Sequence, residues 1–277
     1  AALINIVLDP ILIFGLFGMP RLEIQGAALA SAIARLVAMA IAYYVLIYRW
    51  HLLRIPTWCW ARIKRSWFDV LHVGIPAAGT NMIIPLSGTI ITAMLASFGA
   101  YAVAGMGIAT RIEPLLLICF YSLSAIISPF SGQNFGAKLL ARVYQGVYYA
   151  CAFSFVLALV IAAFMFVFSS HIVGVFTSDA EIASVAISYL HIVPISYGAA
   201  AIIMIVNASF NGIGKPLAAT TISVLRVVVL YLPLAYLGSY YWGIKGIFMA
   251  YTAVNIISAI IAIVWFHHMA QKCLRNA

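Results

Sequence analysis

The chain has 277 residues, of which 66% are hydrophobic and 8% charged, and its mean hydropathy is +1.12. A soluble domain is roughly half apolar and about a quarter charged, so this composition excludes that class and predicts an all-α, polytopic bundle of membrane helices. The net charge of +9 does not indicate nucleic-acid binding, because the basic residues lie between the apolar segments. The four cysteines are far apart and lack metal-ligand spacing, so we expect free thiols, no cofactor and no metal site.

Eight apolar segments follow one another, and each is expected to form a membrane span. The first, residues 1–17, is shorter than the about 20 residues that a full span requires, so we expect the chain to begin inside a helix and to be a fragment. A short amphipathic segment at residues 67–72 is expected to lie at the membrane interface. The remaining spans are predicted at residues 26–48, 76–98, 101–133, 146–168, 182–210, 217–237 and 244–267.

A basic segment at residues 49–66 separates the second span from the third. It holds five of the chain's 15 Lys and Arg residues, and short loops of this kind are retained on the cytoplasmic side during insertion. Counting the spans outward from this loop leaves only Arg21 and Lys245 as basic residues on the outer side. The inner side collects Arg49, Arg54, Arg62, Lys64, Arg65, Lys138, Arg142, Lys215, Lys272 and Arg275. This bias predicts the direction of every span.

An internal repeat links the two ends of the chain. Residues 9–15 contain a proline within a span and end in glycine, and residues 26–30 open the next span with glycine and small residues. Residues 232–238 and 246–250 show the same pattern near the C-terminus. We interpret spans three to eight as one complete six-helix unit. About four spans and the beginning of a fifth are then expected to precede the first residue.

Six short motifs, in this order, resemble those of the multidrug and toxic compound extrusion (MATE) transporters, and the similarity covers essentially the whole chain. They are Asn5-x-x-x-Asp9-Pro10, Gly26-Ala27-Ala28, Gly74-Ile75-Pro76, Arg111-Ile112-Glu113, Gly132-Gln133-Asn134 and Gly212-x-Gly214-Lys215-Pro216. Such transporters have twelve helices in two six-helix lobes. The resemblance implies a partial MATE-type bundle. Residues 1–48 would end the N-terminal lobe, 49–66 the inter-lobe loop, 67–270 the C-terminal lobe and 271–277 a cytoplasmic tail.

Asp9 is the first candidate for coupling chemistry, because an aspartate within an apolar helix is costly and usually faces a cavity or a partner. Asn5 lies one helical turn earlier on the same face, so a carboxylate and an amide oxygen can converge on a proton-linked water or a small cation. The resemblance implies that Asn5 and Asp9 belong to a cation-responsive site and adds Ser31 on the next helix. The alternative is a structural role for Asp9 beside the Pro10 kink.

A second group of polar residues could form a gate or line a substrate cavity. Arg111 and Glu113 are two positions apart, so a straight helix points them to different faces, and a structural ion pair with another span is an equal alternative. Asn81, Asn207 and Asn211 could line a cavity, although single hydrogen bonds between helices are the commoner use of such residues.

One departure from the family concerns sodium. The resemblance would place acidic residues on two helices of the C-terminal lobe in the sodium-coupled bacterial branch, where this chain has Ile84 and Ala200. This difference favours a proton-responsive site in the N-terminal lobe. Both H⁺ and Na⁺ remain open as the coupling ion.

The expected function is secondary active efflux of amphipathic, often cationic compounds, exchanged for protons or sodium by alternating access. The expected location is the bacterial cytoplasmic (inner) membrane, as a multi-pass monomer whose partners are small molecules and lipids, and not nucleic acid. A lipid-linked precursor flippase of the same superfamily and a non-transporting scaffold are the alternatives. An intramembrane enzyme is not expected, because the chain lacks an HExxH pair and paired catalytic aspartates.

Overall fold

The computed structural model describes residues 2–51 and 60–275, with side chains omitted at some positions between 62 and 84 and from 270 onward, except 271. The chain divides into two compact units, Ala1–Arg65 (unit 1) and Ser66–Ala277 (unit 2).

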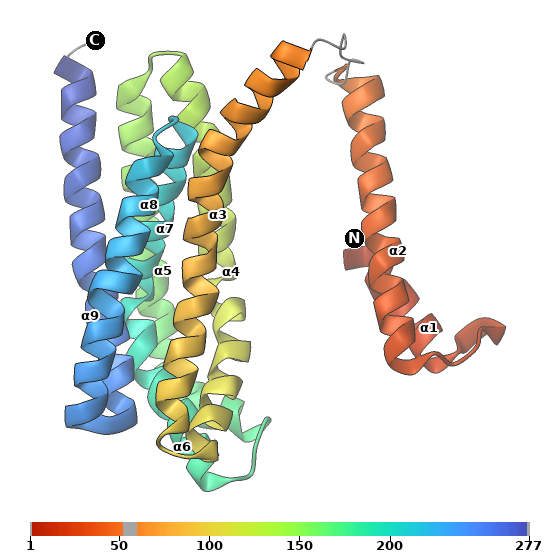
Figure 1. Cartoon of the computed structure of the whole chain (residues 1–277). Coiled ribbons are helices and arrows are strands. Elements are labelled where there is room, and N and C mark those ends of the chain that lie inside the picture. Colours follow the sequence, from red (N-terminus) through yellow and green to blue (C-terminus); the bar gives the residue numbers. More distant parts are fainter. Residues whose placement is uncertain (1, 52–59, 276–277) are drawn as a thin grey trace. The chain divides into compact units, whose positions relative to one another are not determined.

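Unit 1 is a helical hairpin. Helix α1 (Ala2–Phe14) leads through the 3₁₀ turn η1 (Leu16–Gly18) into α2 (Glu23–Tyr44), which ends in the π-helical turn η2 (Val45–Arg49) (Figure 1). Gly15 has φ +72°, a conformation that suits glycine at the end of a helix. Gly26 lies directly against the backbone of Leu12, so a side chain there would collide with α1. A glycine at this position therefore allows the close approach of the two helices.

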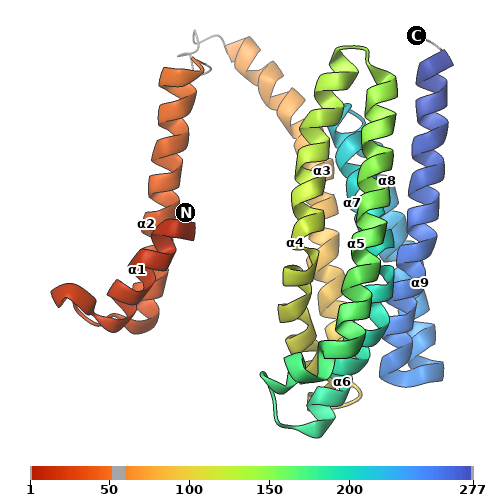
Figure 2. The ribbon, with the colours of Figure 1, turned by 180° about the vertical axis from the view of Figure 1, so that it is seen from behind.

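Unit 2 is a bundle of long antiparallel helices, which Figures 1 and 2 show from opposite sides. Its last helix reverses direction at Gly243 (φ 60°, ψ −142°), a conformation open almost only to glycine. The elements are α3 (Trp60–Ala96), α4 (Ala100–Gly136), α5 (Leu140–Gly174), α6 (Ala180–Ile192), η3 (Val193–Ser196), α7 (Tyr197–Gly212), α8 (Pro216–Val224), η4 (Leu225–Tyr231) and α9 (Leu232–Arg275).

The observed helices match most of the predicted spans. Among the described residues, five helical stretches are long and apolar enough to cross a membrane. They are Glu23–Arg49, Ala100–Gly136, Leu140–Gly174, Ala180–Gly212 and Pro216–Met269. The last contains the reversal at Gly243 and so accounts for two predicted spans. The spans expected at 1–17 and 76–98 correspond to the shorter apolar helices Ala2–Phe14 and Pro85–Ala96.

The predicted basic loop is wrong in its second part. Helix α3 already begins at Trp60 and continues to Ala96, so residues 60–66 are helical and residues 67–72 do not form a separate interfacial helix. Residues 60–66 contain neither proline nor glycine, and therefore nothing in them stops a helix. Residues 52–59 lie outside the described part of the chain.

Helices α4 and α7 are in close contact near their C-terminal ends. Gly132 lies against the backbone of Gly212, and the adjacent Ser131 donates a buried hydrogen bond of 2.9 Å to Ser209 Oγ. Small residues bring membrane helices together in this way, because lipid supplies no hydrophobic driving force between them. The large side chains Phe120, Tyr197 and Phe210 are fully buried in the interior of unit 2.

The two ends of unit 2 carry opposite charge. The turn between α4 and α5 holds Lys138, Arg142 lies in the first turn of α5, and Lys215 precedes α8 at the same end of the bundle (Figure 1). At the other end, Asp179 caps α6 by accepting hydrogen bonds from the backbone N–H groups of Glu181 and Ile182, at 2.9 and 3.1 Å. Within unit 2, this distribution agrees with the inner and outer sides expected from the sequence.

Candidate functional site

The three residues predicted for the cation-responsive site lie on the two helices of unit 1. Asn5 and Asp9 are one turn apart on α1, and Asn5 Nδ2 donates a hydrogen bond of 3.4 Å to Ser31 Oγ on α2. Asn5 Oδ1 and Asp9 Oδ1 are buried and have no hydrogen-bond partner. The structure thus leaves two oxygen acceptors unused within an apolar hairpin.

Local sequence explains how this site is held. Pro10 follows Asp9 and has no N–H group, so the backbone carbonyl of Ile6 lacks its usual helical partner next to the carboxylate. The Ser31 hydroxyl group accepts the hydrogen bond from Asn5 Nδ2, so the amide oxygen of Asn5 remains available. Carboxylate and amide oxygens are ligands that bind a proton-linked water or a hard cation such as Na⁺. The arrangement suits reversible binding of a small cation.

The structure separates the two charged residues predicted on α4. Arg111 is exposed on the surface of unit 2, whereas Glu113 points into the bundle, where its Oε1 atom is buried without a hydrogen-bond partner. Glu113 interacts with the Tyr189 hydroxyl group on α6 and, electrostatically, with the Arg226 guanidinium on η4. The two α4 residues therefore have different surroundings, and a role of either one in a gate stays a prediction.

The predicted asparagines have different surroundings. Asn207 on α7 donates a hydrogen bond of 3.3 Å to Ser223 Oγ on α8, which is the helix-bridging role considered as the alternative. Asn211 is exposed one turn later. The side chain of Asn81 lies outside the described residues, as does that of Ile84, while Ala200 is buried in α7.

A cluster of tyrosines around Glu113 was missed by the sequence analysis. Arg226 Nη2 donates a hydrogen bond of 3.4 Å to Tyr251 Oη, and the guanidinium carbon lies 5.8 Å from the centre of that ring. Tyr231 packs edge-on against Tyr251 with ring centroids 5.2 Å apart. Tyrosine is common in membrane helices as a packing or interface residue, so the number of tyrosines in the sequence does not indicate a polar cluster. The intramembrane position of Arg226 was the available clue, because it required a partner.

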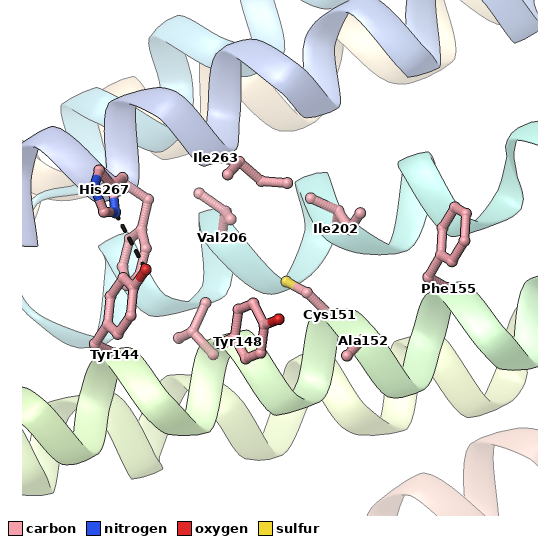
Figure 3. A pocket seen from close by; sticks show the side chains of 11 residues that line it. Tyr144, Tyr148, Cys151, Ala152, Phe155, Ile202, Val206, Ile263 and His267 are labelled. Atoms are coloured by element: carbon pink, nitrogen blue, oxygen red, sulfur yellow. Dashed lines mark hydrogen bonds between the residues drawn. The ribbon is translucent and has the colours of Figure 1, made fainter.

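Unit 2 also contains a cavity of about 270 Å³ between α5, α7 and α9 (Figure 3). One end is polar, where Tyr144 Oη lies 3.2 Å from His267 Nδ1, and the walls are apolar, with Cys151 and Ile263 among them. None of the residues predicted for a site lines this cavity. Cys151 in this wall is a free thiol.

These observations define a polytopic α-helical membrane protein with ionisable groups buried inside its spans, an arrangement typical of secondary transporters. The chain belongs to the MatE family, whose model matches residues 76–237. It is 35% identical to the FAD transporter of Shewanella oneidensis over 272 residues, which cover 98% of this chain and 59% of that protein. It is 24% identical to the multidrug export protein MepA of Staphylococcus aureus, over 94% of this chain and 56% of that protein.

Solved structures show the same fold. The crystal structure of the Vibrio cholerae MATE transporter VcmN in its bent form aligns with a TM-score of 0.82 and 34% identity, covering 99% of this chain and 60% of that one. The chain thus spans about three fifths of the length of the relatives it matches. The resemblance to MATE transporters and the all-α membrane fold are confirmed. Because the members of this family are transporters, the expectation that the chain is not an enzyme is confirmed as well.

Proposed function

We propose that the chain is part of a secondary active efflux transporter, which exports amphipathic compounds in exchange for H⁺ or Na⁺ by alternating access. The observation that carries this proposal is the pair of buried, unpaired oxygens on Asn5 and Asp9 within one apolar hairpin. The similarity to a multidrug export protein supports an amphipathic substrate. We place the transporter in the bacterial inner membrane as a multi-pass monomer in contact with lipids.

Cation binding would act on the bend of α1. An ionised Asp9 next to Pro10 attracts water or a cation into the hairpin, whereas a neutral Asp9 allows the helix to close around it. The two states of the helix would have different affinities for the exported compound, and this difference in affinity couples the ion to the substrate. The unused oxygens of the site accept the incoming ion in one of these states.

Efflux of a fluorescent cationic dye from everted vesicles tests the proposal, with proton and sodium gradients imposed separately on the transporter expressed from its whole gene. We expect one gradient to drive dye movement and Asp9→Asn to abolish it. Glu23→Gln is the matched control, because Glu23 is an exposed acid of unit 1, paired with Arg21 at 3.5 Å on the surface. Driven efflux that survives in Asp9→Asn would falsify the assignment of the coupling site.

A flavin nucleotide is a second candidate substrate, because the chain is 35% identical to an FAD transporter. FAD carries negative charge, so its transport would require basic groups along the path, and Arg111 is an exposed cation within α4. Loading the same vesicles with FAD in place of dye separates the two substrates. Movement of neither compound would favour a lipid-linked precursor flippase or a scaffold.

A further inference from the structure

The segment between α8 and α9 departs from ordinary helix geometry. Residues Leu225–Tyr231 form the π-helical segment η4, and the N–H group of Leu232 bonds to the carbonyl of Val227, five residues earlier. Pro233 gives the physical reason, because its missing N–H leaves the carbonyl of Val229 without an α-helical partner. π-Helical turns are rare and are frequently found at functional sites.

This segment places Arg226 close to a buried acid on another helix. Glu113 on α4 interacts electrostatically with Arg226, but no ion pair at salt-bridge distance joins them among the described residues. The guanidinium is held instead by Tyr251, through the hydrogen bond of 3.4 Å and the ring face 5.8 Å away. Glu113 Oε1 consequently lacks a donor inside the bundle. A carboxylate in this position either gains a closer cation or takes up a proton.

The surroundings of Glu113 contain few other charges. Arg226 is the cation among the groups that interact with Glu113, and the rest are phenols. His191 on α6 is bound to Ser169 Oγ at 2.8 Å and therefore faces α5. The phenols are Tyr121 on α4, Tyr189 on α6, Tyr197 on α7, Tyr231 on η4 and Tyr251 on α9.

We propose that Glu113 is a second proton-binding site, located in unit 2, and that its charge sets the position of Arg226 and of the π-helical segment η4. In the ionised state the carboxylate accepts the Tyr189 O–H group and attracts Arg226. When one proton from water binds, the neutral carboxyl no longer attracts Arg226, which then stays with Tyr251 as in this structure, and η4 is held less firmly against α4. Proton binding by Glu113 does not depend on the proposed function, whereas a role of this proton in efflux rests on it.

Infrared difference spectroscopy of the purified full-length transporter in lipid nanodiscs, between acidic and alkaline pH, measures this proton directly. We expect a protonated-carboxyl band that is lost in Glu113→Gln and retained in Asp9→Asn. Glu181→Gln, which removes an exposed acid at the end of α6, should keep the band. If Glu113→Gln does not fold, Glu113→Asp should shift the band. A band unchanged by either Glu113 variant overturns the proposal.

Amide hydrogen exchange of residues 225–232 tests the conformational part. After correction for the intrinsic pH dependence, exchange in this segment should become several-fold faster at acidic pH, and Glu113→Gln should exchange fast at both pH values. Arg226→Lys, which keeps the charge, should retain the pH response, whereas Arg226→Gln should lose it. Exchange that does not respond to pH overturns the link to η4. Neither the infrared band nor the exchange rate depends on dye efflux, so both can be interpreted even if the proposed function is wrong.

Discussion

Ser131 on α4 and Ser209 on α7 share a fully buried hydrogen bond of 2.9 Å, which joins residues 78 positions apart in the sequence. The glycines Gly132 and Gly212 lie beside this bond, with their backbones in contact. The bond therefore forms where the backbones of the two helices touch without side chains between them. The stability of unit 2 should be especially sensitive to added volume at this point.

Gly212→Ala should destabilise the protein, because its new methyl group would meet the carbonyl oxygen of Ser128 on α4. Overpacking of this kind typically costs about 1–3 kcal/mol. Gly107→Ala on α4 is the matched control, since no atom lies within 4 Å of the added carbon. Thermal unfolding of the purified protein in detergent measures both variants. Equal midpoints for the two would contradict the close contact.

Asn207→Ala should cause a small loss of stability, because it removes the hydrogen bond between α7 and Ser223 on α8. Such bonds contribute about 0.6 kcal/mol on average in membrane helices. Asn211→Ala, on the same face but exposed, should leave the unfolding midpoint unchanged. Dye efflux should remain in both variants. A loss of efflux in a stable Asn207→Ala protein would instead indicate that this residue lines the substrate path.

Ser31→Ala should weaken the coupling site without abolishing it. Ser31 accepts the hydrogen bond from Asn5 Nδ2 and thereby orients the amide, and a hydrogen bond of this type contributes about 1 kcal/mol. We expect a several-fold higher ion concentration for half-maximal efflux, with the maximal rate retained. Asn5→Ala removes an oxygen of the site and should have the larger effect. If Ser31→Ala is as damaging as Asp9→Asn, Ser31 is itself a ligand.

Gly243→Ala should disturb the reversal within α9. The backbone there has φ 60° and ψ −142°, and holding a residue with a side chain in such a region costs on the order of 1–3 kcal/mol. Gly174→Ala at the end of α5 is the control, because its φ is not positive and no atom lies near the added carbon. Thermal midpoints compare the two. A stable Gly243→Ala protein would show that the turn tolerates another geometry.

Most of the fold could be predicted because hydropathy and charge bias act over whole spans, where no single residue decides the outcome. The continuity of α4 through Pro114 and Pro129 is less apparent from the sequence, since a proline that ends a soluble helix is tolerated in a membrane helix. The start of α3 at Trp60 was missed because the basic residues between 49 and 66 were interpreted as one loop. Basic residues suggest a loop by their position, although they are good helix formers.

The residues of the candidate sites could be predicted from the sequence only where they lie on one helix. Asn5 and Asp9 could be paired from the sequence, because their spacing places them one turn apart on a single helix. The cluster around Glu113 could not be predicted in this way, because its members lie on three other elements. They are Tyr189, Arg226 and Tyr251. No periodicity within one helix predicts which residue of another helix it will face. The π-helical turn adds to this difficulty, because its wider turn changes which face of the helix the following residues occupy.

The opposite charge at the two ends of unit 2 also bears on how the protein is made. Lys138 and Lys215 lie in short turns and Arg142 in the first turn of α5, next to span ends where the insertion machinery responds to basic residues during synthesis. Asp179 and Glu181 lie at the N-terminal end of α6, at the other end of the unit. Unit 2 therefore contains its own orientation signal and does not need to inherit its direction from the helices translated before it. We therefore expect unit 2, made as a separate polypeptide, to insert into the bilayer in the same direction as it does in the whole protein.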